Sequence, residues 1–309
     1  MNELELIRRL IPILPGNASV VTGAGDDCAV LDVGLADKHL LFKTDAVVEG
    51  IHFNKEAPGR SIGHKALGRC LSDVAAMGGA PLCALVTLGL PHGFDAAQVE
   101  AMYRGMSDLA IRHGVAIVGG ETTTSPERVF VSVAVLGTVR QTSCVRRSGA
   151  KAGDAIFVTG MLGGSRAGKH LEFEPRLQEG HWLAARGTVH AMIDLSDGLA
   201  TDLRHLLDAS GVGAELLAEA IPVSADARKR SRQSGAPTPL TAALTDGEDF
   251  ELLFTVPASD AVRLLDDWKE AFPALPLHCI GKITTEHGLC IRDRRGARPL
   301  EEHGYIHFE

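Results

Sequence analysis

The sequence predicts an α/β protein built from two domains. The chain has 309 residues, of which 45% are hydrophobic, so it is longer than most single domains and can bury a sizeable core. Aromatic residues account for only 5%, whereas glycine occurs 34 times, a combination that favours tight turns between helices and strands over an aromatic-packed β-sandwich. Short β-branched runs also recur between segments of helical periodicity. Together these observations favour helices packed on sheets.

In the first half of the chain, the clearest element is a helix over residues 61–77. Its apolar side chains recur at three- and four-residue spacing, and the glycines at 78–79 end it. The apolar run 115–118 indicates a buried strand that delivers the Gly-Gly-Glu motif at 119–121 at its C-terminal end. The remaining predicted elements are helices over 2–11 and 95–113 and strands over 28–31, 40–44, 84–90 and 129–139.

The second half begins in a turn-rich stretch near 140–150, which divides the chain into predicted domains 1–142 and 143–309. A helix over 196–209 is expected, with Ser196 or Asp197 as its cap. The other predicted elements are strands over 155–159, 250–256 and 280–283 and a polar loop over 231–239.

Charge and composition exclude several classes of protein. The formal net charge is −8, so a general nucleic-acid binder, which would carry a basic stripe, is not expected. No apolar run reaches membrane-spanning length, and residues 1–9 lack the apolar core of a signal peptide, so we expect a cytoplasmic protein. The six cysteines are far apart and form no C-x-x-C pair, which predicts core thiols in a reducing compartment.

Six short acidic clusters are spread along the chain, next to Gly, Ser or Thr. Such carboxylates suit Mg²⁺, a hard ion that takes oxygen ligands and usually keeps phosphate oxygens and water in its shell. Each cluster alone is explained as well by a helix cap or a turn. Asp73 fits that explanation poorly because it lies inside an apolar helix, and Glu121 because it follows a strand expected to be buried. The clusters are Gly25-Asp26-Asp27, Thr44-Asp45, Leu71-Ser72-Asp73, Gly119-Gly120-Glu121-Thr122-Thr123, Asp194-Leu195-Ser196-Asp197 and Gly247-Glu248-Asp249.

Donors for a phosphate ligand are present, but the standard nucleotide motifs are missing from the sequence. Arg147 offers a bidentate fork for phosphate oxygens, and glycines next to the acidic clusters would let backbone N–H groups approach an anion. The glycine-rich stretch 163–169 differs in spacing from a P-loop, and there is no kinase-type G-x-G-x-x-G. Nothing predicts a nucleophilic hydrolase, and of the thirteen histidines only His52, in a loop shortly after Asp45, stands out. The sequence indicates phosphate chemistry on another architecture.

Eight short motifs rich in acids, glycine and aromatic residues follow one another along the chain. They lie at 25–29, 44–53, 64–78, 119–123, 147–151, 194–199, 247–253 and 304–308. In this order they resemble the motifs of the thiamine-monophosphate kinase family, within the superfamily of aminoimidazole ribonucleotide synthetase. The resemblance implies a two-domain α/β fold of the aminoimidazole ribonucleotide synthetase type, whose N-terminal sheet forms a homodimer interface with ATP bound nearby.

The resemblance also implies transfer of the ATP γ-phosphoryl group to thiamine monophosphate, giving thiamine diphosphate and ADP, with several Mg²⁺ ions. No general base is expected, because the acceptor is a phosphate monoester with a second pKa of about 6 and is largely a dianion at pH 7. Arg147 would instead stabilise charge during the transfer. By motif position, the metal ligands would be Asp27, Thr44, Asp45, Asp73, Glu121, Asp194 and Asp197; the ATP contacts Gly120, Glu121, Arg147 and Ser196; and the substrate contacts His52, Glu248 and Tyr305.

This chain departs from the family's usual residues at five positions. Lys43 stands near the expected metals where serine is common, Cys70 replaces asparagine, Glu121 replaces aspartate, Gly164 replaces aspartate and Asp246 replaces glycine. Two other functions stay open. The chain could be another ATP-dependent synthetase of the superfamily with a different small substrate, or a non-catalytic nucleotide-binding paralogue.

Overall fold

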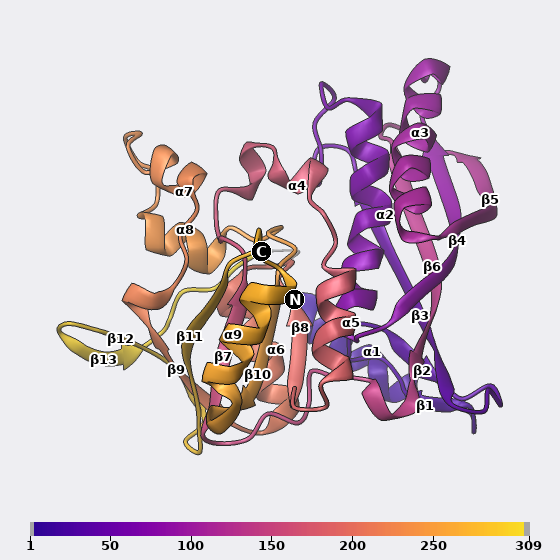
Figure 1. Cartoon of the computed structure of the whole chain (residues 1–309). Coiled ribbons are helices and arrows are strands. Elements are labelled where there is room, and N and C mark those ends of the chain that lie inside the picture. The colour runs from indigo at the N-terminus through magenta and orange to yellow at the C-terminus, as the bar shows by residue number, and fades with distance from the viewer. Residues whose placement is uncertain (1–2, 306–309) are drawn as a thin grey trace.

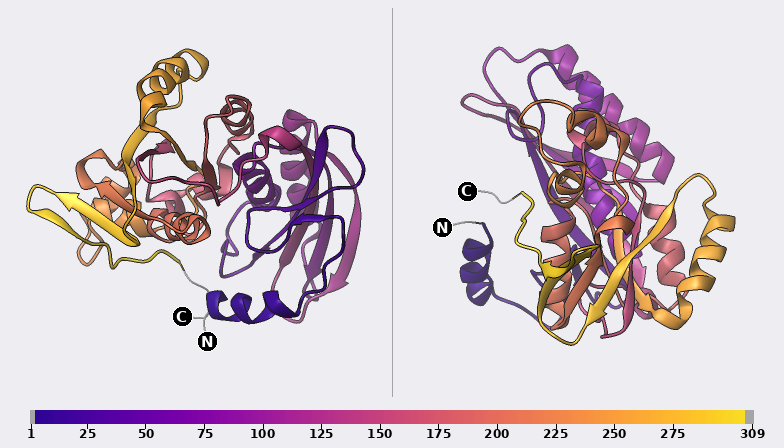
Figure 2. Two further views of the ribbon diagram at one scale, coloured as in Figure 1. Left: turned by 90° about the horizontal axis from the view of Figure 1, so that it is seen from below. Right: turned by 90° about the vertical axis from the view of Figure 1, so that its left-hand side faces the viewer.

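The computed structural model describes residues 3–305, and these form two lobes that are each built on one β-sheet (Figure 1). Figure 2 shows the lobes from two further sides, with the first helix and the last described residues close to each other. Asn2, at the start of the helix predicted over 2–11, and Ile306-His307-Phe308 of the last motif lie outside the described residues. Among the described helices, none has the length and apolar character needed to cross a membrane.

The first sheet has six strands in the order β1-β2-β3-β6-β4-β5. β4 and β5 are parallel, and the other neighbours are antiparallel. α2 and α3 pack together on one face of this sheet (Figure 1). The elements are α1 Glu3–Leu10, β1 Val20–Thr22, β2 Ala29–Leu31, β3 Lys38–Val48, α2 Gly59–Ala76, β4 Ala80–Leu90, α3 Ala96–His113, β5 Ala116–Thr124 and β6 Phe130–Arg140.

β5 differs from the strand predicted over 115–118. It runs as far as Thr124 along the edge of the sheet, and most of its residues are exposed, so the expectation of a buried strand is wrong. The reason is that Gly119 and Gly120 bring no apolar side chain to bury, and an edge strand has a neighbour on one side only. Glu121 therefore lies within the strand rather than beyond its end.

The second sheet has seven strands in the order β13-β12-β9-β11-β7-β10-β8. Only β9 and β12 form a parallel pair within the described residues. The strands are β7 Asp154–Thr159, β8 Ala191–Asp194, β9 Gly213–Leu217, β10 Leu252–Pro257, β11 Leu277–Thr284, β12 Gly288–Asp293 and β13 Gly296–Pro299. The helices of this lobe are α4 Lys169–Glu172, α5 Leu177–Ala185, α6 Leu199–Ser210, α7 Ala225–Arg230, α8 Pro239–Thr245 and α9 Ala261–Ala271.

The start of α6 corrects the predicted cap. The helix begins at Leu199, and its N-cap is Gly198, so neither Ser196 nor Asp197 caps it. The carboxylate of Asp202, in the first turn of the helix, accepts hydrogen bonds from the backbone N–H groups of Asp197 (3.1 Å) and Gly198 (3.0 Å). Because this acid satisfies the first donors from inside the helix, the Ser-Asp pair is left in the preceding loop.

Of the two buried hydrophobic clusters, one joins the two lobes and the other lies within the second lobe. α2 contacts both the first sheet and α5 of the second lobe, and the buried cluster continues from Leu71 in α2 to Phe157 and Phe254 in the second sheet. Gly180 of α5 is needed here, because a Cβ at this position would lie 2.1 Å from the carbonyl oxygen of Ala75. The close approach fixes α2, and the acids that it carries, against the second lobe.

The cysteines agree only in part with the prediction. All six are free thiols within the part of the chain that the structure describes. Cys28 and Cys70 are buried as expected, but Cys279 is exposed on β11, so the prediction of a core thiol is wrong for that residue. Its position follows from the alternation of β11, in which Ile280, not Cys279, faces the core.

Candidate functional site

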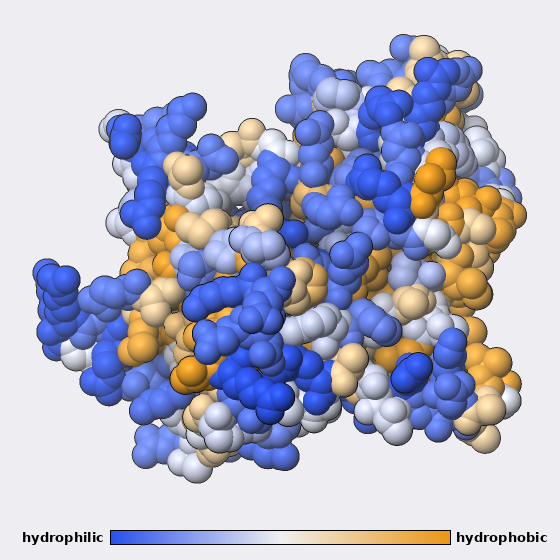
Figure 3. Space-filling view, viewed as in Figure 1, coloured by the Kyte–Doolittle hydropathy of each residue, from blue (hydrophilic) through white to orange (hydrophobic). Residues whose placement is uncertain are grey.

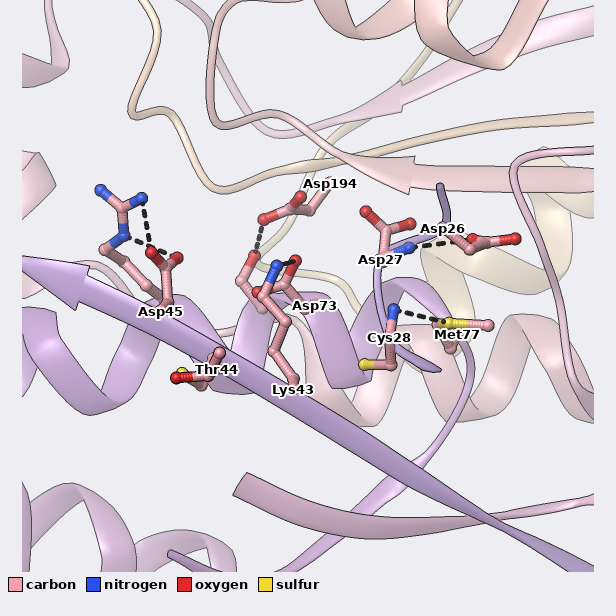
Figure 4. A network of polar contacts seen from close by, with 12 residues as sticks. Asp26, Asp27, Cys28, Lys43, Thr44, Asp45, Asp73, Met77 and Asp194 are labelled. Atoms are coloured by element: carbon pink, nitrogen blue, oxygen red, sulfur yellow. Dashed lines mark hydrogen bonds and ion pairs between the residues drawn. The ribbon is translucent and has the colours of Figure 1, made fainter. Parts of the chain in front are cut away.

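Three buried carboxylates meet where the two lobes join. Asp27 precedes β2, Asp73 lies in α2, and Asp194 ends β8. Each offers an oxygen atom, and these atoms all lie within 4.8 Å of one another (Figure 4). We call this group the carboxylate cluster. Segments that are distant in the sequence bring the three acids together, and each of the three was predicted as a metal ligand.

Each acid of the carboxylate cluster has one polar partner. Arg147 Nη2 lies 2.7 Å from Asp27 Oδ1, and Lys43 Nζ lies 2.7 Å from Asp73 Oδ1. The hydroxyl of Ser72 donates to Asp194 Oδ2 over 2.5 Å. Asp27 Oδ2 is buried and has no hydrogen-bond partner among the described residues. A buried carboxylate oxygen without a donor is costly, so this atom indicates a position for a cation.

The electrostatics of the cluster agree with such a position. Burial, followed by repulsion from Asp27, raises the pKa of Asp194 to about 6. Burial lowers the pKa of Lys43, but the nearby Asp73 and Asp45 outweigh this and raise that pKa above its ordinary value. The acids therefore destabilise one another and stabilise added positive charge. Oxygen ligands in a cluster of this kind fit Mg²⁺.

A pocket beside the cluster contains the residues predicted for the substrate. Its lining includes Ser196 and Asp197, which lie two and three residues after Asp194 of the cluster. Arg69 lines the pocket and also binds Asp45 with both Nε (2.9 Å) and Nη2 (3.0 Å). We call this the substrate pocket. Its lining residues are Ile51, His52, Arg69, Arg166, Ser196, Asp197, Asp246, Glu248 and Tyr305.

Glu248 and His52 are held by a buried lysine of α2. Lys65 Nζ lies 2.5 Å from Glu248 Oε1 and donates to the carbonyl oxygen of His52 over 2.6 Å. Nδ1 of His52 accepts a hydrogen bond from the N–H of Val48 (3.1 Å). Burial, followed by the charges of Arg69 and Lys65, lowers the pKa of His52 to about 4. His52 is thus a neutral, oriented ring at neutral pH.

Tyr305 reaches the pocket from the end of the described chain. Its N–H donates to the carbonyl oxygen of Asp197 (2.9 Å), and its ring lies 5.7 Å from the guanidinium carbon of Arg166. Gly304 allows this approach, because a Cβ there would lie 1.9 Å from the Asp197 oxygen. An aromatic ring and an arginine thus form one wall of the pocket.

Not all predicted ligands come together in one chain. The side chain of Thr44 points away from the cluster and bonds Val133 O (3.2 Å), because neighbouring residues of a strand face opposite sides of a sheet (Figure 4). Gly120 and Glu121 lie on β5, which β4 and β6 separate from β3 by three strand spacings of about 4.8 Å. Asp197 belongs to a second group with Asp202 and His205. Four of the seven predicted metal ligands therefore lie outside the cluster: Thr44, Asp45, Glu121 and Asp197. Of these, Asp45 is bound to Arg69.

The sequence reasoning missed two cations of α2, Lys65 and Arg69. They precede Asp73 at four-residue spacing, which places all three along one stripe of the helix. Charged residues at this spacing inside an otherwise apolar helix were a signal that could have identified them. Without a known partner, however, a lysine or arginine is usually assigned to the solvent face.

Two of the departures from the family's pattern meet in the structure. Asp246 Oδ2 accepts a hydrogen bond from the N–H of Gly164 over 2.7 Å, and Arg230 Nη2 bonds both oxygens of Asp246 (2.6 and 2.7 Å). A Cβ on Gly164 would lie 2.6 Å from the N atom of Ala227. An acidic side chain therefore still stands at this loop, supplied from position 246 instead of 164.

Comparison with known proteins supports the resemblance seen in the sequence. The family model "AIR synthase related protein, N-terminal domain" matches residues 25–139, and "AIR synthase related protein, C-terminal domain" matches residues 140–293. The thiamine-monophosphate kinase of Rhodopirellula baltica is 41% identical over 87% of this chain and 85% of its own length. The thiamine-monophosphate kinase of Escherichia coli (strain K12) is 36% identical over 99% of this chain and 98% of its own.

Solved structures agree with these sequence matches. A structure described as AaThiL complexed with AMPPCP and TMP superimposes with a TM-score of 0.84 and 31% identity, covering 99% of this chain and 97% of that one. The crystal structure of thiamine-monophosphate kinase from Stenotrophomonas maltophilia K279a gives a TM-score of 0.75 and 32% identity, over 93% and 95% of the two chains.

Proposed function

Because the chain belongs to the thiamine-monophosphate kinase family, we propose that it transfers the γ-phosphoryl group of ATP to thiamine monophosphate and releases thiamine diphosphate and ADP. The observation that carries this proposal is the carboxylate cluster beside the substrate pocket. Cations held by the cluster would meet the phosphates, and the pocket would take the organic part of the acceptor. The cytoplasmic location stays a prediction.

The cluster residues fit a role in binding Mg²⁺. Asp27, Asp73 and Asp194 would supply carboxylate oxygens, and the unpartnered Oδ2 of Asp27 would gain the positive partner that it lacks. Bound there, Mg²⁺ would shield the charge of the two approaching phosphate groups. That several Mg²⁺ ions bind is also part of the proposal.

The chain's own residues would position the reactants. Arg147, two bonds of which go to Asp27, is close enough to the cluster to share its guanidinium with phosphate oxygens. His52 is a neutral ring whose Nδ1 already accepts from Val48, so its Nε2–H would donate. It need not remove a proton, because the acceptor phosphate is already a dianion at neutral pH. Glu248 and Tyr305, which line the same pocket, would also contact the acceptor. Transfer would then depend on alignment and charge stabilisation.

A direct assay tests the proposed function. Purified protein with ATP, Mg²⁺ and thiamine monophosphate is expected to form thiamine diphosphate and ADP in equal amounts, measured by chromatography, and EDTA should stop the reaction. If no thiamine diphosphate forms and ADP is released only after another small acceptor is supplied, the result would favour the synthetase alternative. ATP binding without turnover for any acceptor would favour the non-catalytic paralogue.

We also propose that the first sheet forms a homodimer interface. Its face away from α2 exposes large apolar side chains, and Figure 3 shows an apolar area on this side of the molecule, over β4 and β5. Such a contiguous area is typical of a protein interface. Within one chain, β6 and β4 separate Gly120 and Glu121 on β5 from β3. Their proposed ATP contacts would therefore be made in a dimer, where a second copy covers this face. The apolar residues are Phe42 (47% exposed), Leu82 (57%), Leu85 (50%) and Val118 (61%).

Charge on the sheet face is expected to separate the copies. The double variant Leu85→Asp/Val118→Asp should sediment with half the mass of the unaltered protein, because two buried carboxylates at an interface cost several kcal/mol. Val262→Asp, at a 72% exposed position of α9, is the matched control and should not change the mass. An unaltered protein that sediments as a monomer at micromolar concentration would disprove the proposed dimer.

A further inference from the structure

Lys43 lies inside the carboxylate cluster. It comes from β3, where it faces α2, and its Nζ atom lies 2.7 Å from Asp73 Oδ1 (Figure 4). Only 23% of the lysine side chain and 9% of the aspartate side chain are exposed. A lysine in such a position has given up most of its hydration, so its charge must be compensated by the acids around it.

Asp73 of the cluster compensates this charge by direct contact, whereas Asp45, the next acid on the same strand, contributes from farther away. Asp45 also faces α2, but Arg69 binds both of its carboxylate oxygens. Among the described residues, Asp73 is the acid within 4 Å of Lys43 Nζ. The ammonium group of Lys43 thus binds the carboxylate of Asp73, which would otherwise be free to bind a divalent ion.

The charge balance of the cluster shows what this means. Asp27, Asp73 and Asp194 carry three negative charges when ionised, and Lys43 and Arg147 already bring two positive charges in contact with them. A divalent ion next to Asp73 would compete with Lys43 for the oxygen Oδ1 and would be repelled by the ammonium group. The Asp27 Oδ2 atom, which has no partner in the described chain, leaves a position open on the other side.

We propose that Lys43 is a resident cation that fills one cation position of the carboxylate cluster, so that the chain binds one divalent ion fewer than it would without this lysine. The inference rests on the proposed metal-binding role of the cluster. It also gives a reason for a lysine beside Thr44 and Asp45, a position near the expected metals where serine is common in the family. The lysine supplies permanently a charge that would otherwise depend on the Mg²⁺ concentration.

Counting bound Mn²⁺ tests the inference. Mn²⁺ replaces Mg²⁺, and the bound ions per chain are measured by the electron paramagnetic resonance signal of free Mn²⁺, with and without a non-hydrolysable ATP analogue. Lys43→Ser is expected to bind one more Mn²⁺ per chain than the unaltered protein. Lys43→Met, which keeps the buried alkyl chain, should show the same gain and covers the case that the serine variant folds poorly. Both should need a higher Mg²⁺ concentration for half-maximal activity.

The controls separate this inference from the proposed function. Lys55→Ser removes a lysine that is 80% exposed and should leave the Mn²⁺ count unchanged. The same number of ions in the folded Lys43 variants and the unaltered protein would overturn the role of Lys43 alone. If none of these proteins binds Mn²⁺, the metal-binding role of the cluster fails, and the role of Lys43 fails with it. An unchanged count with weaker binding of the ATP analogue would assign Lys43 to the nucleotide instead.

Discussion

Asp73→Asn is expected to lower the rate of thiamine diphosphate formation at least about 10³-fold, because it removes one of the carboxylates that we propose hold Mg²⁺ around the phosphates. The same change should destabilise the protein. Lys43 would keep its charge while losing the carboxylate 2.7 Å from its Nζ atom, and breaking a buried ion pair on one side costs about 3–5 kcal/mol. Loss of activity alone would therefore not show whether Asp73 acts in catalysis or in folding.

A second variant separates the two effects. In Lys43→Met/Asp73→Asn both charges are removed, so the free energy of unfolding should recover most of what the single variant lost. The activity should stay at the level of Asp73→Asn. Urea denaturation gives the stability, and single-turnover product formation gives the activity. If the double variant regained activity together with stability, the role of Asp73 would be structural.

Long periodic elements of the fold could be predicted from the sequence. The helices expected over 61–77 and 95–113 are confirmed as α2 and α3 within two residues at each end, because their apolar spacing extends over several turns. β8 was missed. It has only four residues, too few to show a period. It forms because β10 pairs with it and α2 packs against it. Tertiary contacts, rather than local propensity, create such strands.

The candidate site was predictable as a set of acids but not as a geometry. Asp27, Asp73 and Asp194 meet as the motifs implied, whereas the alternation of a strand already indicated that the side chains of Thr44 and Asp45 cannot face the same side. Pairing is harder to foresee. Which of Lys43, Lys65 and Arg69 neutralises which carboxylate depends on the packing of α2 against both lobes, and no sequence spacing encodes it.

A second buried ion network ties the second lobe to the helix that supports the site. Glu251 is 1% exposed and accepts hydrogen bonds from Arg176 Nε and Nη2 and from Lys169 Nζ, each at 2.8 Å. The hydroxyl of Thr159 donates to the same carboxylate over 2.8 Å. Arg176 precedes α5, and α5 packs on α2. Glu251 therefore connects the second sheet to the helix on which Asp73 stands.

Glu251→Gln should be among the most destabilising conservative changes in this chain. It leaves Arg176 (17% exposed) and the partly exposed Lys169 (35%) with no opposite charge, so we expect a loss of about 3–5 kcal/mol and, for a chain of this size, a fall in Tm of roughly 5–8 °C. Lys169→Met, which keeps Arg176 on the carboxylate, should cost less than half as much. Glu270→Gln, on the exposed side of α9, is the matched control and should change Tm by less than about 2 °C.

The pH dependence of stability gives an independent check on Glu251. Burial raises its pKa, but the hydrogen bonds and charges of Arg176 and Lys169 outweigh this and hold the pKa below the ordinary value of 4.5. The stabilisation is therefore fully present above pH 4.5 and is lost as the pH falls through the lower folded-state pKa. In urea denaturation series at decreasing pH, the difference in unfolding free energy between the unaltered protein and Glu251→Gln should shrink below pH 4.5. A constant difference across that range would mean that the carboxylate charge is not what holds α5 in place.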